Sequence, residues 1–188
     1  MPSLRVLKVA CALLTSGISV AALSAEPPAA EPDHGVWQRH EYDFQFLGFT
    51  STYSCDGLAS KLKLLLIAAG ARADAKSTSG ACTRSYGSPD KFARASLTFY
   101  TLAPLGTGES ANAAVGGVWR SVVLADRSPR DLALGDCELV EQFRDKVLPM
   151  FTTRNIGNRM TCVPNQLSGS VINLKFDVFA GVPAAKKK

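Results

Sequence analysis

Acidic residues gather in one stretch of this 188-residue sequence, where a pair of carboxylates would suit hydrolysis. Glycosidases use two carboxyl groups, one as a general acid and the other as a base or nucleophile. The candidates are Asp126, Asp131, Asp136, Glu138 and Glu141. The last three lie where a helix is expected to begin, and N-capping and the helix dipole favour carboxylates there in any case. We therefore expect structural roles for these residues, with a hydrolase as the alternative.

The two histidines, His34 and His40, lie close together near the start of the chain. Such a pair can bind a metal, but exposed histidines without a function are commoner. The sequence contains no G-x-S-x-G, P-loop, G-x-G-x-x-G, H-E-x-x-H or C-x-x-C-H motif. Its motifs therefore disfavour the common serine hydrolases, nucleotide enzymes, zinc proteases and c-type haem carriers. We expect neither a cofactor nor a metal.

The cysteines predict disulfides. Cys11 falls in the leading apolar segment, which leaves Cys55, Cys82, Cys137 and Cys162. Four cysteines allow three pairings, and similar spacings of 27 and 25 positions favour Cys55–Cys82 and Cys137–Cys162. A zinc site is disfavoured because there is no C-x-x-C or Cys/His cluster.

Residues 1–25 have the composition of a secretory signal peptide. Arg5 and Lys8 precede an uncharged apolar run, and small residues predict cleavage after Ser24 or Ala25. A transmembrane anchor would need a longer apolar run. Without this segment the formal charge falls from +5 to +3, with 19 basic against 16 acidic residues. We expect export to the periplasm or beyond, and a nearly neutral body that does not favour nucleic acid.

Hydrophobic periodicity predicts an α+β fold. Apolar residues at helical spacing follow Cys55 as far as a stop at Gly70, and again from an N-cap at Asp136 to about Leu148. Strand-like segments are 40–50, 71–76, 95–103, 115–125, 152–163 and 171–180. We predict a two-layer sandwich with an antiparallel or mixed, mostly antiparallel sheet of about six strands and both helices on one face. The order of the elements also suggests a tandem β-α-β-β repeat.

The predicted domain is single and covers residues 40–182, with similar halves at 40–104 and 115–182. A linker rich in proline and alanine precedes it at 26–39, and a basic tail follows at 183–188. The segment 71–76 alternates alanine with charged residues, which is typical of an edge strand that could accept a partner strand.

Two surface features are candidates for binding. Leu64 and Ile67 widen the apolar stripe of the first helix beyond the needs of a surface helix, so they are a candidate partner surface or part of a deeply buried helix. The second feature is a basic loop formed by Arg84, Tyr86, Lys91 and Arg94, which would suit anionic lipid headgroups or acidic envelope polymers unless it is simply solvated.

These expectations favour a binding protein over an enzyme. We predict an exported, disulfide-stabilised interaction module of the cell envelope, which binds a partner protein or an anionic envelope component. The alternatives are an envelope hydrolase using acids of the 126–141 region, or a carrier of small apolar ligands, which would need a large cavity between helices and sheet.

Overall fold

Six antiparallel strands form one sheet around two helices. The computed structural model describes residues 34–80, 89–106 and 113–182. Its elements are β1 (His34–Gln45), α1 (Cys55–Ala68), β2 (Lys76–Ser79), β3 (Arg94–Pro104), β4 (Val115–Ala125), α2 (Cys137–Lys146), β5 (Thr153–Asn158) and β6 (Asn173–Gly181). The strand order is β2-β3-β1-β4-β6-β5. The predicted α+β sandwich with a six-stranded antiparallel sheet is confirmed.

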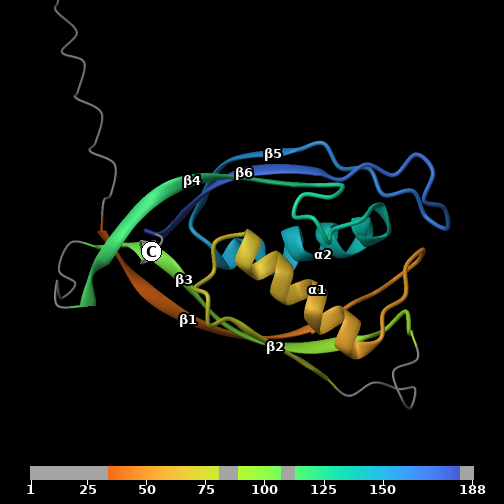
Figure 1. The fold of residues 1–188 in the computed structure, drawn as a ribbon, viewed down its shortest axis with the longest axis horizontal. Coiled ribbons are helices and arrows are strands. Elements are labelled where there is room, and N and C mark those ends of the chain that lie inside the picture. The colour runs from red at the N-terminus through yellow and green to blue at the C-terminus, as the bar shows by residue number, and fades with distance from the viewer. Residues whose placement is uncertain (1–33, 81–88, 107–112, 183–188) are drawn as a thin grey trace, which may run out of the picture. The chain divides into compact units, whose positions relative to one another are not determined.

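The sheet is sharply curved because its two central strands pair only at their ends. β1 and β4 pair at His34–Gly116 and Gly35–Val115, which we call the joint, and they diverge beyond it. The sheet therefore has two arms, β2-β3-β1 and β4-β6-β5. Figure 1 shows β1 and β4 crossing at the left of the view, with both helices between the two arms of the sheet. The helices therefore cover the concave face.

Each arm contains one half of the chain with the same order of elements. The first half runs β1-α1-β2-β3 and the second β4-α2-β5-β6, and the first strand of each half lies at the joint. The registers also correspond, because Trp37 of β1 pairs with Leu102 and Trp119 of β4 pairs with Phe179. The tandem repeat stays a prediction, which this shared topology supports.

The main core lies between the helices and the concave face. The two helices bury apolar residues at spacings of three and four, as an amphipathic helix requires. Strands β3 and β6 bury every second residue over much of their length. Fully buried members are Phe44, Leu58, Leu62, Leu65, Phe99, Leu139, Phe143, Leu174 and Phe176. Neither helix in the described part of the chain is long and apolar enough to cross a membrane.

A smaller apolar cluster occupies the other face of the sheet, at the joint. Leu102 and Phe179 are almost completely buried there. The close packing needs glycine on both central strands. A Cβ atom on Gly35 would lie 2.4 Å from the Ala103 carbonyl oxygen, and one on Gly117 would lie 2.3 Å from the Phe179 ring. These glycines let the two halves cross closely.

The boundaries of α1 follow the predicted signals. The Ser54 side chain accepts a hydrogen bond from the Gly57 amide at 3.0 Å, which caps the first turn. Gly70 has a φ of 100°, the left-handed conformation that favours glycine after a helix.

The predicted boundary between the linker and the folded domain was wrong. β1 begins at His34, so residues 34–39 belong to the sheet and not to a linker.

His40 is half-buried. Its ring stacks on Phe99 and bonds the Thr101 hydroxyl at 2.8 Å, and burial lowers its pKa.

The predicted strand at 71–76 was also wrong. This segment is mainly a turn after α1, held by the Ala71 amide donating to the Leu66 carbonyl and the Ala75 amide donating to Arg72. The edge strand β2 occupies residues 76–79 instead. At the opposite edge, β5 ends at Asn158, well before the predicted end at 163, and its register shifts between Arg154 and Gly157.

Candidate functional site

Asp136 is buried and links the two helices. The Tyr53 hydroxyl donates to its Oδ1 at 2.6 Å, and the Lys61 ammonium pairs with its Oδ2 at 2.7 Å. The Ala133 amide also donates to Oδ2, at 2.8 Å. Burial and this carboxylate together raise the pKa of Tyr53 far above its usual value. The contacts satisfy both carboxylate oxygens, so Asp136 has a structural role.

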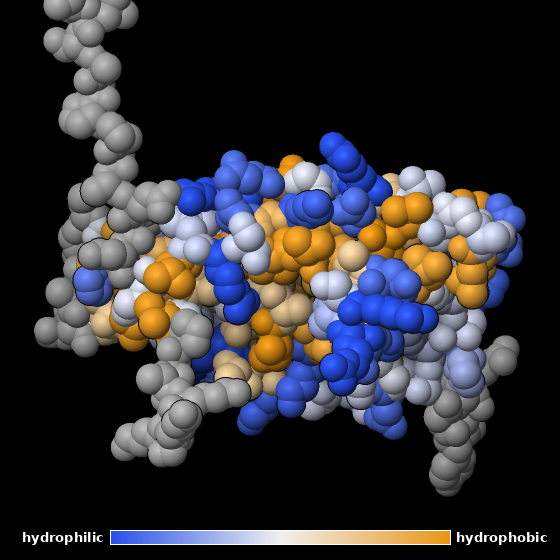
Figure 2. Space-filling view, turned by 45° about the horizontal axis from the view of Figure 1, so that its top comes forward, coloured by the Kyte–Doolittle hydropathy of each residue, from blue (hydrophilic) through white to orange (hydrophobic). Residues whose placement is uncertain are grey.

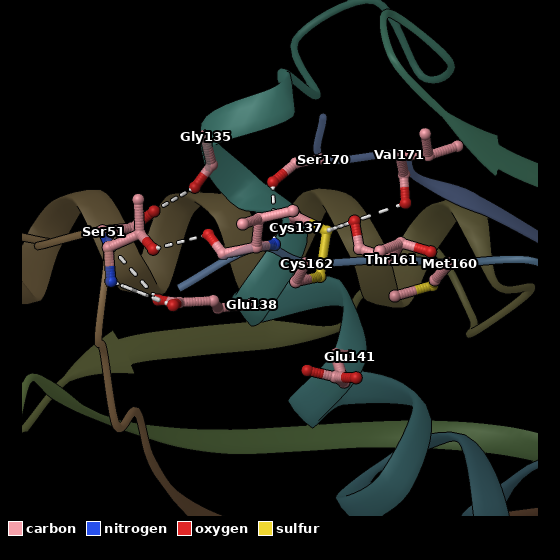
Figure 3. The surroundings of a disulfide bond; sticks show 12 residues. Ser51, Gly135, Cys137, Glu138, Glu141, Met160, Thr161, Cys162, Ser170 and Val171 are labelled. Carbon is pink, nitrogen blue, oxygen red and sulfur yellow. Dashed lines mark hydrogen bonds between the residues drawn. A yellow bond between two sulfur atoms is a disulfide. The ribbon is translucent and has the colours of Figure 1, made fainter. Parts of the chain in front are cut away.

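Glu138 is similarly engaged. Its carboxylate accepts hydrogen bonds from the backbone amides of Phe49, Thr50 and Ser51 at 2.9–3.3 Å. Figure 3 shows the Glu138 side chain pointing from α2 to Ser51. Asp126 and Asp131 lie exposed in the loop before α2. The structure therefore places the two buried carboxylates in the scaffold, which favours the structural interpretation over the hydrolase alternative.

The predicted Cys137–Cys162 disulfide is confirmed. It joins the first residue of α2 to the segment that follows β5, as Figure 3 shows. Cys55 is disulfide-bonded and buried at the start of α1. Its predicted partner, Cys82, lies outside the described residues.

The predicted basic loop is described only in part. Arg84 and Tyr86 lie outside the described residues, whereas Lys91 and Arg94 are exposed before and at the start of β3. The Lys91 carbonyl accepts a hydrogen bond from the Gly48 amide, which extends the pairing of β1 with β3. The loop stays a candidate site.

The predicted partner surface is divided between core and solvent. Leu64 is half-buried and Ile67 is 38% exposed, while the rest of the apolar stripe of α1 is buried. Figure 2 shows hydrophobic side chains in separate patches among charged ones on the visible face. Exposure alone therefore does not distinguish Ile67 from the other exposed apolar residues. Ile67 is distinguished by its position, because it lines a surface groove.

This groove lies where the C-terminal end of α1 approaches the joint of the sheet. Its volume is about 350 Å³. We call it the α1-end groove, and its principal lining residues are Trp37, Ile67, Ala71, Arg72, Arg120 and Val182. Small residues, Ala180 and Gly181 among them, complete its surface. A Cβ atom on Gly181 would lie 2.8 Å from the Trp37 ring, so glycine lets the indole lie against β6.

Arg72 supplies a fixed positive charge to the groove. Its Nε and Nη2 donate to the two carboxylate oxygens of Asp74, each at 2.7 Å. The guanidinium also stacks on Tyr100, 3.6 Å from the ring centroid, and lies 5.7 Å from the centroid of Trp37. The hydrogen bonds from Arg72 lower the pKa of Asp74. This pairing orients the arginine but neutralises part of its charge.

Arg120 is the more available cation. Its side chain comes from β4, and its Nη2 reaches the Ala68 carbonyl at the end of α1 at a long 3.4 Å. A positive charge is favourable there because the carbonyl end of a helix is partly negative. A guanidinium has five N–H donors, so most remain for a ligand.

The groove has the chemistry of a binding site. Apolar and small residues form most of its surface, and its charged lining residues are arginines. Among the described residues that line it, none carries a carboxylate, hydroxyl, thiol or imidazole, the groups that usually act as nucleophiles and bases. This composition suits a molecule with an apolar body and a negative group.

Sequence reasoning found Ile67 but missed the residues around it. Trp37 fell in the predicted linker, and Arg72 was assigned to the solvated side of a strand. A signal for Trp37 exists in the repeated Gly-Val-Trp of residues 35–37 and 117–119. No family model, curated protein or solved structure matches this chain.

Proposed function

We propose that this protein is an exported binding module whose α1-end groove binds an anionic, partly apolar ligand of the cell envelope. The observation that carries the proposal is the groove itself, in which Ile67 and Trp37 lie beside the guanidinium groups of Arg72 and Arg120. Pockets that bind small ligands are mainly apolar, with a few polar groups that fix the orientation.

Export is supported by two features of the chain. The first 25 residues have the pattern of a cleaved signal peptide. The Cys137–Cys162 disulfide favours an oxidising compartment, because cytosolic thiols are kept reduced.

The proposal is tested by titrating the purified protein with decanoate while recording ¹H–¹⁵N NMR spectra. We expect shifts of the amides of residues 67, 70–73 and 120, because these residues line the groove. Decylammonium, which has the same apolar chain and the opposite charge, should bind more weakly. Equal shifts with the two amphiphiles would contradict the proposed role of the arginines.

Substitutions separate the apolar contribution from the charge. Arg120→Ala should weaken decanoate binding about tenfold, since a charged hydrogen bond contributes roughly 1.5–3 kcal/mol and part of that is recovered by water. Ile67→Ser should weaken both amphiphiles. Lys63→Ala is the matched control, because Lys63 is exposed on α1 and does not line the groove. The proposal fails if the Lys63 and Arg120 variants bind decanoate equally well.

A further inference from the structure

A second groove runs along α2, and its chemistry is opposite to that of the α1-end groove. Its volume is about 420 Å³. We call it the α2 groove, and its principal lining residues are Leu47, Phe49, Glu141, Asp145, Cys162 and Pro164. We propose that it is a docking site for a basic, amphipathic peptide segment of a partner protein. This inference is independent of the proposed ligand of the α1-end groove.

One wall is a segment of backbone fixed by α2. β4 pairs with the start of β1 and then diverges, so among the described residues no strand lies beside residues 45–51 on that side. Three α2 side chains, spaced one turn apart, bind this edge instead. Glu138 accepts the amides of residues 49–51, Gln142 bonds both the amide and the carbonyl of Leu47, and Lys146 donates to the Gln45 carbonyl at 3.0 Å. The wall is therefore held at six backbone groups.

The fixed wall presents large apolar side chains to solvent. Leu47 is 44% exposed and Phe49 is 59% exposed. The Leu47 amide and carbonyl and the Phe49 amide bond α2 side chains, and the neighbouring amides of residues 46 and 48 donate to carbonyls of residues 93 and 91. The exposure therefore belongs to an ordered surface. Ordered apolar side chains beside polar ones are typical of protein docking sites.

The opposite wall is fixed by the disulfide. Cys162, bonded to Cys137, lines the groove together with Pro164. The Thr50 hydroxyl connects the two walls, because it donates to the Val163 carbonyl at 3.3 Å and accepts from the Asn165 amide at 2.7 Å. Both sides of the groove are thus built before any partner arrives, which reduces the entropy cost of docking.

The charges that line the α2 groove favour a basic partner. Among the described residues that line the groove, three are carboxylates, Glu138, Glu141 and Asp145, and one is a cation, Lys146. Lys146 is turned inward, where it bonds Gln45 and lies 5.3 Å from the centroid of the Phe44 ring. Arg144 pairs with Asp145 at 2.6 Å and lies 4.0 Å from Glu141, so one cation is shared by two carboxylates. The excess of negative charge favours lysine or arginine beside the apolar contacts.

The test uses two labelled peptides and fluorescence polarisation. One is a short soluble peptide of leucine, lysine and glycine, and the other has glutamate in place of lysine. We expect the lysine peptide to bind and the glutamate peptide to bind at least tenfold more weakly. Salt should weaken the first interaction, because exposed charges are screened. Equal binding of the two peptides, or no binding of the lysine peptide, would overturn the inference.

Variants locate the site and keep the test independent of folding. Phe49→Ser should weaken binding of the lysine peptide by roughly tenfold or more, as for a central interface aromatic. Ile156→Ser is its control, because Ile156 is similarly exposed, at 54%, on β5. Glu141→Lys should also weaken binding, whereas the same reversal at exposed Glu41 should not.

The Glu141 variant changes an exposed side chain, so it stays informative if Phe49→Ser lowers stability. Equal affinity of all four variants for the lysine peptide would show that the α2 groove is not the site. Decanoate binding at the α1-end groove should be unchanged in these variants. A loss of decanoate binding would instead indicate a general defect.

Discussion

Replacing Glu138 with glutamine should destabilise the protein strongly, although the side chain keeps its shape. Glu138 is 7% exposed, and its two oxygens accept the amides of Phe49, Thr50 and Ser51. Glutamine has an NH2 group in place of one carboxylate oxygen, and in its better orientation this donor faces the Thr50 amide, which now lies 2.9 Å from Oε1, at a cost of about 1–3 kcal/mol. The remaining bonds lose their charge, which costs about 1 kcal/mol more. We expect a loss of about 2–4 kcal/mol in the free energy of unfolding.

Glu141→Gln is the matched control for this prediction. Glu141 lies one turn further along α2, its side chain is 45% exposed, and its ion pair with Arg144 is long, at 4.0 Å. An exposed pair of this kind contributes at most about 1 kcal/mol, so the control should retain nearly all its stability.

The assay is urea unfolding followed by circular dichroism, with the m-value checked for each variant. A changed midpoint at a constant m-value reports stability alone. Equal midpoints for the two glutamine variants would refute the structural role of Glu138. That outcome would also return Glu138 to the list of candidate catalytic acids, since a carboxylate that does not hold the fold is free for chemistry.

Three further predictions concern the joint, the helix contact and the disulfide. Gly117→Ala should lose about 1–3 kcal/mol in urea unfolding through overpacking, whereas Gly135→Ala, with no atom within 4 Å of its new Cβ, should not. Tyr53→Phe should lower the free energy of unfolding by about 1–3 kcal/mol, because the buried Asp136 carboxylate loses a hydrogen bond. The wild type should also lose stability more steeply than this variant above pH about 10, because only the unfolded chain then ionises Tyr53, whose pKa is raised in the fold. Replacing Cys137 and Cys162 with serine should cost about 3 kcal/mol, as expected for a loop of 25 residues. An unchanged midpoint for Gly117→Ala, Tyr53→Phe or the serine variant would contradict the contact concerned.

Local signals predicted the ends of α1 well because both ends are chemically marked. Ser54 and Gly70 bracket α1, and both act as caps. β1 was harder because its first residues show no clean alternation. The segment from Gly35 to Trp37 becomes a strand by pairing with residues of β3 more than sixty positions later. Such pairing is set by tertiary structure, and no local window contains it.

After α1, the sequence pattern predicted a strand where the structure has a turn. Alanine and charged residues alternate from Ala71 to Lys76, which imitates the period of a strand. The residues instead serve the groove, where Arg72 stacks on Tyr100 and Ala71 lines the surface. Arg120 joins them only because β4 crosses β1 at the joint. The α1-end groove therefore follows from topology, and the sequence identified only Ile67.

Residues of the same type recur in the two halves at a constant spacing, and the positions without such a match are those at which the halves differ. Equivalent residues lie 82 positions apart at Gly35 and Gly117, Trp37 and Trp119, Cys55 and Cys137, and Arg72 and Arg154. Both arginines stack on aromatic rings of their own half, since Arg154 lies 4.1 Å from the centroid of Trp119. The spacing supports the predicted duplication.

The shared residues lie at the joint, at the disulfide-bonded first residue of each helix and in the arginine stacks. Most of the residues that give the grooves their opposite character are not shared. At the same spacing, Ile67 corresponds to Pro149 and Arg120 corresponds to Gln38. Phe49 corresponds to Asp131, and Glu141 corresponds to Ala59. A duplicated scaffold that kept its joint and changed its surfaces would carry two different grooves, each lined by residues of both halves. The positions at which the halves differ are therefore the first places to substitute when binding is measured.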